Sequence, residues 1–327
     1  MSFIQKDTKM NKIAIVAGVN NDLDAVRGVG VHNSELFKAI NLLNDKNFKF
    51  VSDPKLADVT HYTKFHPFFI SLPFFKPSKK VILTIHDLIP LIYPKQYSRG
   101  LKGGIKFLIN KFLIWKNVDA IITISETSKK DICRFLGVDP KIVYVIYLAP
   151  KDIFKKIPNP KYEGLPKRFA LYTGDINYNK NIPNLIKACE IAKIPLVIAG
   201  KQALEIENMD LTHPETSHLA GVSFKNVIRL GFVSDEELNN LYNLATVYVQ
   251  ASIYEGFGLI VLEAVFCNTS LVVTKTQALV EILGDGLVYV DPNDPDDIAK
   301  GILNPNKNIK LPRKYSWEKA AKETLDV

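Results

Sequence analysis

The 327 residues are enough for two ordinary domains, and a content of 47% hydrophobic and 23% charged residues is that of a globular protein. The net charge of +8 is uneven: residues 1–165 hold 26 Lys and Arg against 14 Asp and Glu, and the remainder holds 16 against 20. No apolar run is long enough to span a bilayer, the start lacks the apolar core of a signal peptide, and no motif that reads bases occurs, so we expect neither a membrane-spanning, a secreted nor a nucleic-acid-binding protein.

The three cysteines, Cys133, Cys189 and Cys267, are few and odd in number and show no metal-ligand spacing. Unpaired thiols fit a reducing compartment, so a cytoplasmic protein is expected. The residues before Met10 are read as an extension rather than as part of the first strand.

Apolar runs typical of buried strands alternate with helix-like segments, which predicts an α/β fold with mainly parallel sheets. In the first half, strands are expected at Ile13–Ala17, Phe48–Val51, near Val59, and at Val81–Ile85, Ala120–Ile124 and Ile142–Ile146. Helices are expected at Ser34–Leu43, Leu101–Val118, and from Ser125 to about Leu136.

Four prolines, Pro150, Pro158, Pro160 and Pro166, mark an interdomain linker. We therefore expect an N-terminal domain at 1–152 and a C-terminal domain at 153–327. The last helix, at 316–327, is expected to pack back on the N-terminal domain.

The second half repeats the alternation of strands and helices. Ser234 and Glu237 form a capping box that begins one of its helices. Ligands of such sheets bind at the carboxyl ends of the strands, so the site is expected in the cleft between the domains. Strands are expected at Phe169–Tyr172, Pro195–Ala199, Val227–Arg229, Val247–Val249 and Leu271–Val273, and helices at Ile182–Ala192 and Ser234–Leu244.

Two glutamates, Glu255 and Glu263, lie eight residues apart around a strand-to-helix junction. Gly256 and Gly258 let the backbone approach a ligand, and the free N–H groups of the next helical turn form an anion site. Two carboxylates beside a phosphate suit hydroxyl partners, because a carboxylate accepts two hydrogen bonds from a vicinal diol. This pattern predicts a site that binds a nucleotide sugar. The alternative is a helix-entry loop in which the helix dipole favours a glutamate.

Further motifs lie at 27–30, 81–90, 172–181 and 230–234. Together with 254–264 they resemble the retaining glycosyltransferases of family four, whose GT-B fold consists of two facing Rossmann-like domains. The resemblance extends from Lys12 to Val327. It implies an acceptor-side N-terminal domain and a donor-binding C-terminal domain. It also implies that Glu255 contacts the donor sugar and Glu263 the ribose, with the amides of Gly256, Phe257 and Gly258 near the sugar and diphosphate.

The resemblance gives Lys180 the role of the cation that neutralises the leaving diphosphate. Many relatives carry an arginine where this chain has Asn179 or Asp175. Lys201, at the end of another strand, is an alternative source of positive charge.

Other site residues are implied in the same way. His86 follows a strand directly and would line the cleft near the transferred sugar. Gly28 and Gly30 correspond to the glycine-rich loop between the first strand and helix. Phe232 and Val233 belong to the turn whose backbone meets the nucleobase, and they leave the base open.

Asp22 and Asp24 have the spacing of the metal-binding Asp-x-Asp of the other large glycosyltransferase fold. Supporting ligands are missing from the sequence around them, so we read them as solvated. Lys180 and helix N-termini can neutralise the negative charge of the diphosphate in place of a metal ion. We therefore expect no metal and no cofactor, with the nucleotide diphosphate sugar as a substrate.

The helix expected at Leu101–Val118 is basic and amphipathic, and a phenylalanine-rich segment precedes it. Such a surface binds anionic lipid, so peripheral contact with the inner face of an anionic membrane is one hypothesis. The alternative is that the apolar side faces the core and the lysines are solvated. The apolar side consists of Ile105, Leu108, Ile109, Phe112 and Trp115, and the lysines are Lys102, Lys106, Lys111 and Lys116.

We therefore expect a retaining, metal-independent hexosyltransferase that moves a hexose from a nucleotide diphosphate sugar to a hydroxyl of a glycan or lipid-linked acceptor. Two alternatives stay open: a nucleotide-sugar epimerase or hydrolase of the same fold, and a catalytically silent sugar-nucleotide-binding subunit. A nicotinamide dehydrogenase is disfavoured, because Asn33 occupies the place of the third glycine of its fingerprint.

Overall fold

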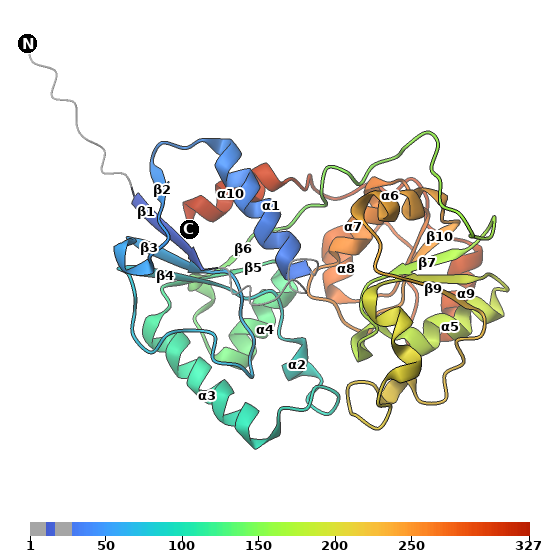
Figure 1. Cartoon of the computed structure of the whole chain (residues 1–327), viewed down its shortest axis with the longest axis horizontal. Helices are drawn as coiled ribbons and strands as arrows, with labels where there is room; N and C mark the ends of the chain where they lie inside the picture. Colours follow the sequence, from blue (N-terminus) through green and yellow to red (C-terminus); the bar gives the residue numbers. More distant parts are fainter. Residues whose placement is uncertain (1–10, 17–27) are drawn as a thin grey trace, which may run out of the picture. The chain divides into compact units, whose positions relative to one another are not determined.

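The computed structural model describes residues 11–16 and 28–327. These residues form two compact units, whose elements are labelled in Figure 1. Unit 1 contains the described residues up to Leu88, together with Arg99–Leu148 and Ser316–Val327. Unit 2 contains Ile89–Ser98 and Ala149–Tyr315. The chain therefore passes from one unit to the other four times.

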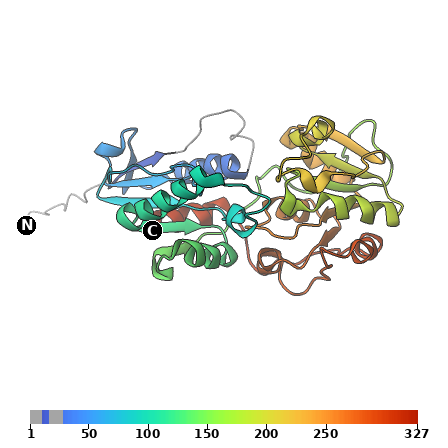
Figure 2. The same cartoon turned by 90° about the horizontal axis from the view of Figure 1, so that it is seen from below.

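Unit 1 is built on a six-stranded parallel sheet with the order β2-β1-β3-β4-β5-β6. Figures 1 and 2 show α3 and α10 on opposite sides of this sheet, and β5 is buried along its whole length as expected of a strand covered on both faces. The strands are β1 (Asn11–Val16), β2 (Phe48–Phe50), β3 (Val59–Tyr62), β4 (Lys80–Thr84), β5 (Ala120–Thr123) and β6 (Val143–Val145). The helices are α1 (Gly28–Leu43), α3 (Gly100–Asn117), α4 (Glu126–Leu136) and α10 (Trp317–Asp326).

Unit 2 is built on a five-stranded parallel sheet with the order β11-β10-β7-β8-β9. Its three central strands are buried at every position, which explains why they read as continuous apolar runs. The strands are β7 (Ala170–Thr173), β8 (Leu196–Ala199), β9 (Val227–Gly231), β10 (Val247–Gln250) and β11 (Leu271–Val273). The helices are α2 (Ile89–Ile92), α5 (Ile182–Ile191), α6 (Asp235–Leu244), α7 (Leu259–Phe266), α8 (Gln277–Leu283) and α9 (Pro295–Leu303).

Side-chain caps fix where several helices begin. The capping box predicted before α6 is confirmed: the Ser234 hydroxyl accepts from the Glu237 amide, and the Glu237 carboxylate accepts from the Ser234 amide at 2.7 Å. Ser316 caps α10 in a similar way, and α10 packs against α1. Each such cap stabilises its helix by about 1 kcal/mol.

The α/β class with mainly parallel sheets is confirmed, and each strand expected from an apolar run is found. One local expectation is wrong. Gly28 and Gly30 lie in the first turn of α1 rather than in a loop, and His32 in the next turn is buried. In the described part of the chain, no helix has both the length and the apolar character that crossing a bilayer requires.

Candidate functional site

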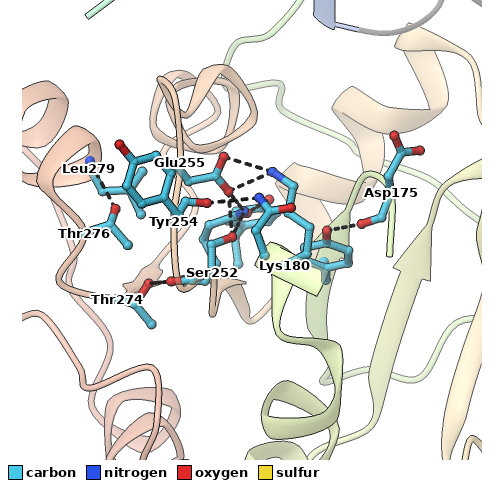
Figure 3. A network of polar contacts seen from close by, with 12 residues as sticks. Asp175, Lys180, Ser252, Tyr254, Glu255, Thr274, Thr276 and Leu279 are labelled. Carbon is cyan, nitrogen blue, oxygen red and sulfur yellow. Dashed lines mark hydrogen bonds and ion pairs between the residues drawn. The ribbon is translucent and has the colours of Figure 1, made fainter. Parts of the chain in front are cut away.

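The centre of the site in unit 2 is the carboxylate of Glu255, in the turn between β10 and α7. Its Oε1 accepts hydrogen bonds from Ser252 Oγ at 2.6 Å, Gln250 Nε2 at 2.7 Å and Lys180 Nζ at 2.8 Å (Figure 3). Lys180 Nζ also donates to Oε2 at 2.9 Å. Gln250 is held in turn by the Tyr248 hydroxyl at 2.6 Å. These three donors hold the carboxylate in a fixed orientation.

Lys180 and Glu255 form a nearly buried ion pair. Their side chains are 17% and 8% exposed, and Lys180 ends a short helical turn, η4 (Tyr178–Lys180), that follows β7. A pair removed from water in this way stays favourable only with further hydrogen bonds, which Gln250 and Ser252 supply. The ammonium group has three N–H bonds and uses two on Glu255, so one remains for a ligand.

The residues on either side of Lys180 connect the segment after β7 to the turn between β10 and α7. Asn179 Nδ2 donates to the Tyr254 carbonyl at 3.0 Å, and Asn181 Nδ2 donates to the Ala251 carbonyl at 2.9 Å. The Tyr97 hydroxyl donates to Asn179 Oδ1 at 2.8 Å. Asn179 thus has a structural role at a place where relatives were expected to carry a cation.

Glu263, in α7, is the second carboxylate of the motif and is also buried. The Tyr242 hydroxyl donates to Glu263 Oε2 at 2.9 Å and lies 3.0 Å from Thr173 Oγ1. Burial raises the pKa of the Glu263 carboxyl to about 8, although the bond from Tyr242 lowers it. Asp235 raises this pKa further, and Lys151 lowers it. Glu263 therefore holds a proton at neutral pH until a ligand favours the carboxylate.

The N-terminus of α7 carries the glycines of the motif. Gly258 is the N-cap residue, and its φ of +112° is a conformation that other residues adopt only with strain. An added Cβ would also lie 2.7 Å from Leu279 Cδ2, so the backbone and the lack of space both require glycine. Among the described residues, no side chain caps this helix. The preceding Phe257 is buried against Tyr315. Backbone N–H groups at this end of α7 suit an anion.

Two further predicted residues lie in the turn between β9 and α6. The Phe232 side chain is 56% exposed, and Lys201 Nζ lies 5.5 Å from the centre of its ring. Val233 follows and precedes the cap residue Ser234. The structure thereby brings Lys201 to Phe232, whereas the partner of Lys180 is Glu255.

His86 belongs to unit 1, two residues after β4, where it lies beside His32. His32 Nδ1 and His86 Nε2 are 2.7 Å apart, and burial lowers the pKa of His86 to about 4. Burial and then His86 lower the pKa of His32 well below its ordinary value. Both rings are therefore neutral at physiological pH, and one donates to the other. On its other side, His32 stacks on Trp317 of α10.

Sequence reasoning missed Gln250, Ser252, Tyr242 and His32. A signal existed for Gln250, because a polar residue that ends a buried parallel strand lies at the ligand-binding edge of the sheet. No such signal marked His32, which reads as one residue of an amphipathic helix. Asp22, Asp24 and Arg27 lie outside the described residues. Within 11–16 and 28–327, no group of three or more His, Cys, Asp or Glu side chains is arranged to hold a metal ion.

Comparison with known proteins places this site in context. O-antigen chain mannosyltransferase B of Escherichia coli is 26% identical over 279 residues, which cover 76% of this chain and 70% of that protein. Serotype-specific mannosyltransferase WbdA of Escherichia coli is 30% identical over 246 residues, which cover 71% of this chain and only 30% of that protein. The crystal structure of HepE from Anabaena with UDP and glucose superposes with a TM-score of 0.63 at 14% identity, covering 90% of this chain and 89% of that one.

The two parallel α/β units and the likeness to HepE identify the GT-B fold of glycosyltransferases. The sequence model of Glycosyl transferases group 1 matches residues 154–323, and that of Glycosyltransferase Family 4 matches residues 25–149. The chain belongs to the family of glycosyl transferases group 1 and is a glycosyltransferase.

Proposed function

We propose that this glycosyltransferase moves a hexosyl group from a nucleoside diphosphate sugar to a hydroxyl of a glycan or lipid-linked acceptor, with retention of configuration and without a metal ion. Peripheral contact with an anionic membrane is part of the same proposal. The observation that carries the proposed transfer is the buried Lys180–Glu255 pair, which lies beside the N-terminus of α7. Glu255 also precedes a second buried carboxylate, that of Glu263, by eight residues.

The donor diphosphate has two complementary sources of positive potential in unit 2. Lys180 keeps one N–H bond beyond the two that it donates to Glu255, so it can bind a phosphate oxygen without leaving the pair. The amides at the start of α7 add the positive end of a helix dipole. Charge that develops on the leaving diphosphate is thus met by groups already in position.

The two carboxylates suit the two hydroxylated parts of the donor. Glu255 orients the sugar, because its Oε2 retains accepting capacity beside the bond from Lys180. Glu263 accepts from the ribose diol when it is ionised. Since Lys180, Gln250 and Ser252 hold Glu255 firmly, an orienting role fits it better than a nucleophilic one. Retention is then attributed to displacement on one face of the sugar, with His86 shaping the acceptor side.

The names of related proteins support this choice. Mannosyltransferases of O-antigen synthesis are similar in sequence, and HepE was crystallised with UDP and glucose. The test is a panel of UDP-, GDP- and ADP-linked hexoses, mannose included, ranked by the rise in Tm and followed by product analysis with the best donor. A new glycoside supports transfer. Free sugar or an epimerised donor would replace the proposal with a hydrolase or epimerase, and binding without any product would indicate a silent subunit.

Metal independence gives an expected result once a donor and acceptor are found. Transfer should survive EDTA, because Lys180 and the amides of α7 take the place of a cation. The measurement is the initial rate with EDTA, and then with Mn²⁺ or Mg²⁺ restored. Loss with EDTA and recovery with either ion would contradict it and would direct attention to Asp22 and Asp24.

A further inference from the structure

Helix α3 of unit 1 has two apolar sides, and only one of them packs on the protein. The buried side faces the rest of unit 1 through Gly103, Asn110, Leu113, Ile114 and Asn117. A second row, spaced by four, three, four and three residues, lies on the opposite side of a helix with 3.6 residues per turn. This outer row, which is 91% exposed at its start and 81% exposed at its end, consists of Leu101, Ile105, Leu108, Phe112 and Trp115.

The phenylalanine-rich segment before β4 is attached to α3 and extends this apolar surface. Asn110, fully buried, donates to the Phe69 carbonyl at 2.6 Å and accepts from the Ser71 amide at 3.1 Å. Asn117 donates to the Pro73 carbonyl at 2.9 Å. The segment is therefore held in a fixed form, with several large side chains outward. Those that are exposed are Phe69, Ile70, Phe74 and Phe75, the last at 80%.

Positive charge surrounds the outer row and negative charge is nearly missing from the sequence there. Helix α3 itself carries four lysines, Lys102, Lys106, Lys111 and Lys116, and no acidic residue. Lys106 Nζ lies 5.3 Å from the centre of the Phe69 ring, and Lys116 Nζ lies 5.4 Å from that of Phe75. Lysines that lie along aromatic rings can direct their charge outward while the rings enter an apolar phase.

We propose that the outer row of α3 and the exposed phenylalanines form a surface that lies on an anionic bilayer, with the aromatic and aliphatic side chains among the acyl chains and the lysines at the headgroups. The inference corrects the core-facing alternative for this helix, because its predicted apolar residues Ile105, Leu108, Phe112 and Trp115 are exposed. A helix with a basic border and an apolar face rich in Trp and Phe has the composition of interfacial helices.

A second copy of the chain suits this surface less well. The four-three spacing is that of a coiled-coil seam, and the charged flanking positions of such a seam are Lys102, Lys111 and Lys116. Helix α3 has no acidic residue to pair with them. Two copies would therefore place lysine against lysine, whereas anionic lipid neutralises them.

The inference rests on the proposed function and deepens it, because it names the surface that makes the proposed membrane contact and would bring the enzyme to a lipid-linked acceptor. Binding to lipid needs neither donor nor transfer, so it is tested separately. The probe is a set of vesicles of phosphatidylglycerol and phosphatidylcholine, compared with phosphatidylcholine alone. We expect co-sedimentation with the anionic vesicles that declines as salt rises from 0.1 to 0.5 M.

Two variants test the two parts of the surface. K102E/K106E/K111E should weaken binding to anionic vesicles about 100-fold, from roughly fivefold for each lysine near such a surface. L101S/L108S removes apolar side chains and should weaken it with the lysines intact. The matched control, K300E/K307E/K310E in unit 2, makes the same charge change at exposed residues and should bind normally. Unchanged Tm in each variant separates these effects from unfolding.

Fluorescence gives an independent measurement, because the chain has two tryptophans, exposed Trp115 and buried Trp317. Emission should shift to shorter wavelength with anionic vesicles in the native chain and not in W115F, which still sediments. Equal or negligible binding to both kinds of vesicle would overturn the proposal. So would analytical ultracentrifugation that finds a dimer which L101S/L108S dissociates.

Discussion

Replacing Lys180 with alanine should nearly abolish transfer and should also weaken the fold. In the proposed function Lys180 meets the leaving diphosphate, and loss of one such preorganised donor lowers kcat by about 100- to 1000-fold. The same change leaves Glu255 charged and 8% exposed without its partner. Breaking a buried pair on one side costs about 3–5 kcal/mol of unfolding free energy. The measurements are initial rates and urea unfolding.

A double variant separates the two effects. K180M/E255Q removes both charges of the pair and should recover much of the stability, while transfer stays lost. K187A, at an exposed lysine of α5 in the same unit, is the matched control and should keep both rate and stability. Full transfer by K180A would remove Lys180 from the reaction, and transfer regained in the double variant would show that the single variant had lost only its fold.

Nucleotide binding should depend on the ionisation of Glu263. Because its pKa is raised to about 8, the free protein holds a proton there at pH 7, and a ribose diol that needs the carboxylate must displace it. Affinity for the nucleotide should therefore rise between pH 6.5 and 8.5. Calorimetry in buffers of different ionisation enthalpy should detect proton release at pH 7. E263A should weaken binding by about 1–3 kcal/mol.

Stability should change in the opposite direction over the same range. A carboxyl whose folded pKa lies above its unfolded value of 4.5 favours the fold below pH 4.5, and that contribution is lost as pH rises through about 8. E263Q mimics the protonated form, so its unfolding free energy should exceed that of the native chain increasingly from pH 5 to pH 8.5. Parallel pH curves for the two proteins would contradict the raised pKa of Glu263. Nucleotide affinity that E263A leaves unchanged would place Glu263 outside the ribose site.

The parts of the fold predicted well are those whose physical signal is local. Buried parallel strands such as Val247–Gln250 are apolar throughout because both faces are covered. The cap of α6 needs only Ser234 and Glu237, three residues apart. The pairing of Lys180 with Glu255 had no such signal, because the two residues are 75 positions apart and meet only when β7 and β10 become neighbours.

Helix α3 illustrates a different limit. Periodicity shows that a helix has an apolar row, and it does not show which row faces the sheet when there are two. The row that packs on the rest of unit 1 contains Asn110 and Asn117, polar residues that the sequence pattern predicts to be exposed to solvent. They are buried because the carbonyl groups of the neighbouring segment satisfy their amides. Tertiary hydrogen bonding thus decided the orientation.

The four chain crossings between the units set a rule for exchanging parts between relatives. A chimera joined once, near Ala149, would combine most of a foreign unit 2 with the native Ile89–Ser98 segment, whose Tyr97 bonds Asn179 beside Lys180 in the native chain. It would also carry a foreign segment in place of Ser316–Val327, and so lose Trp317, which stacks on His32 in the native chain. Exchanging a whole unit with a relative therefore requires three junctions beyond that one, so that each short segment stays with the unit that it completes.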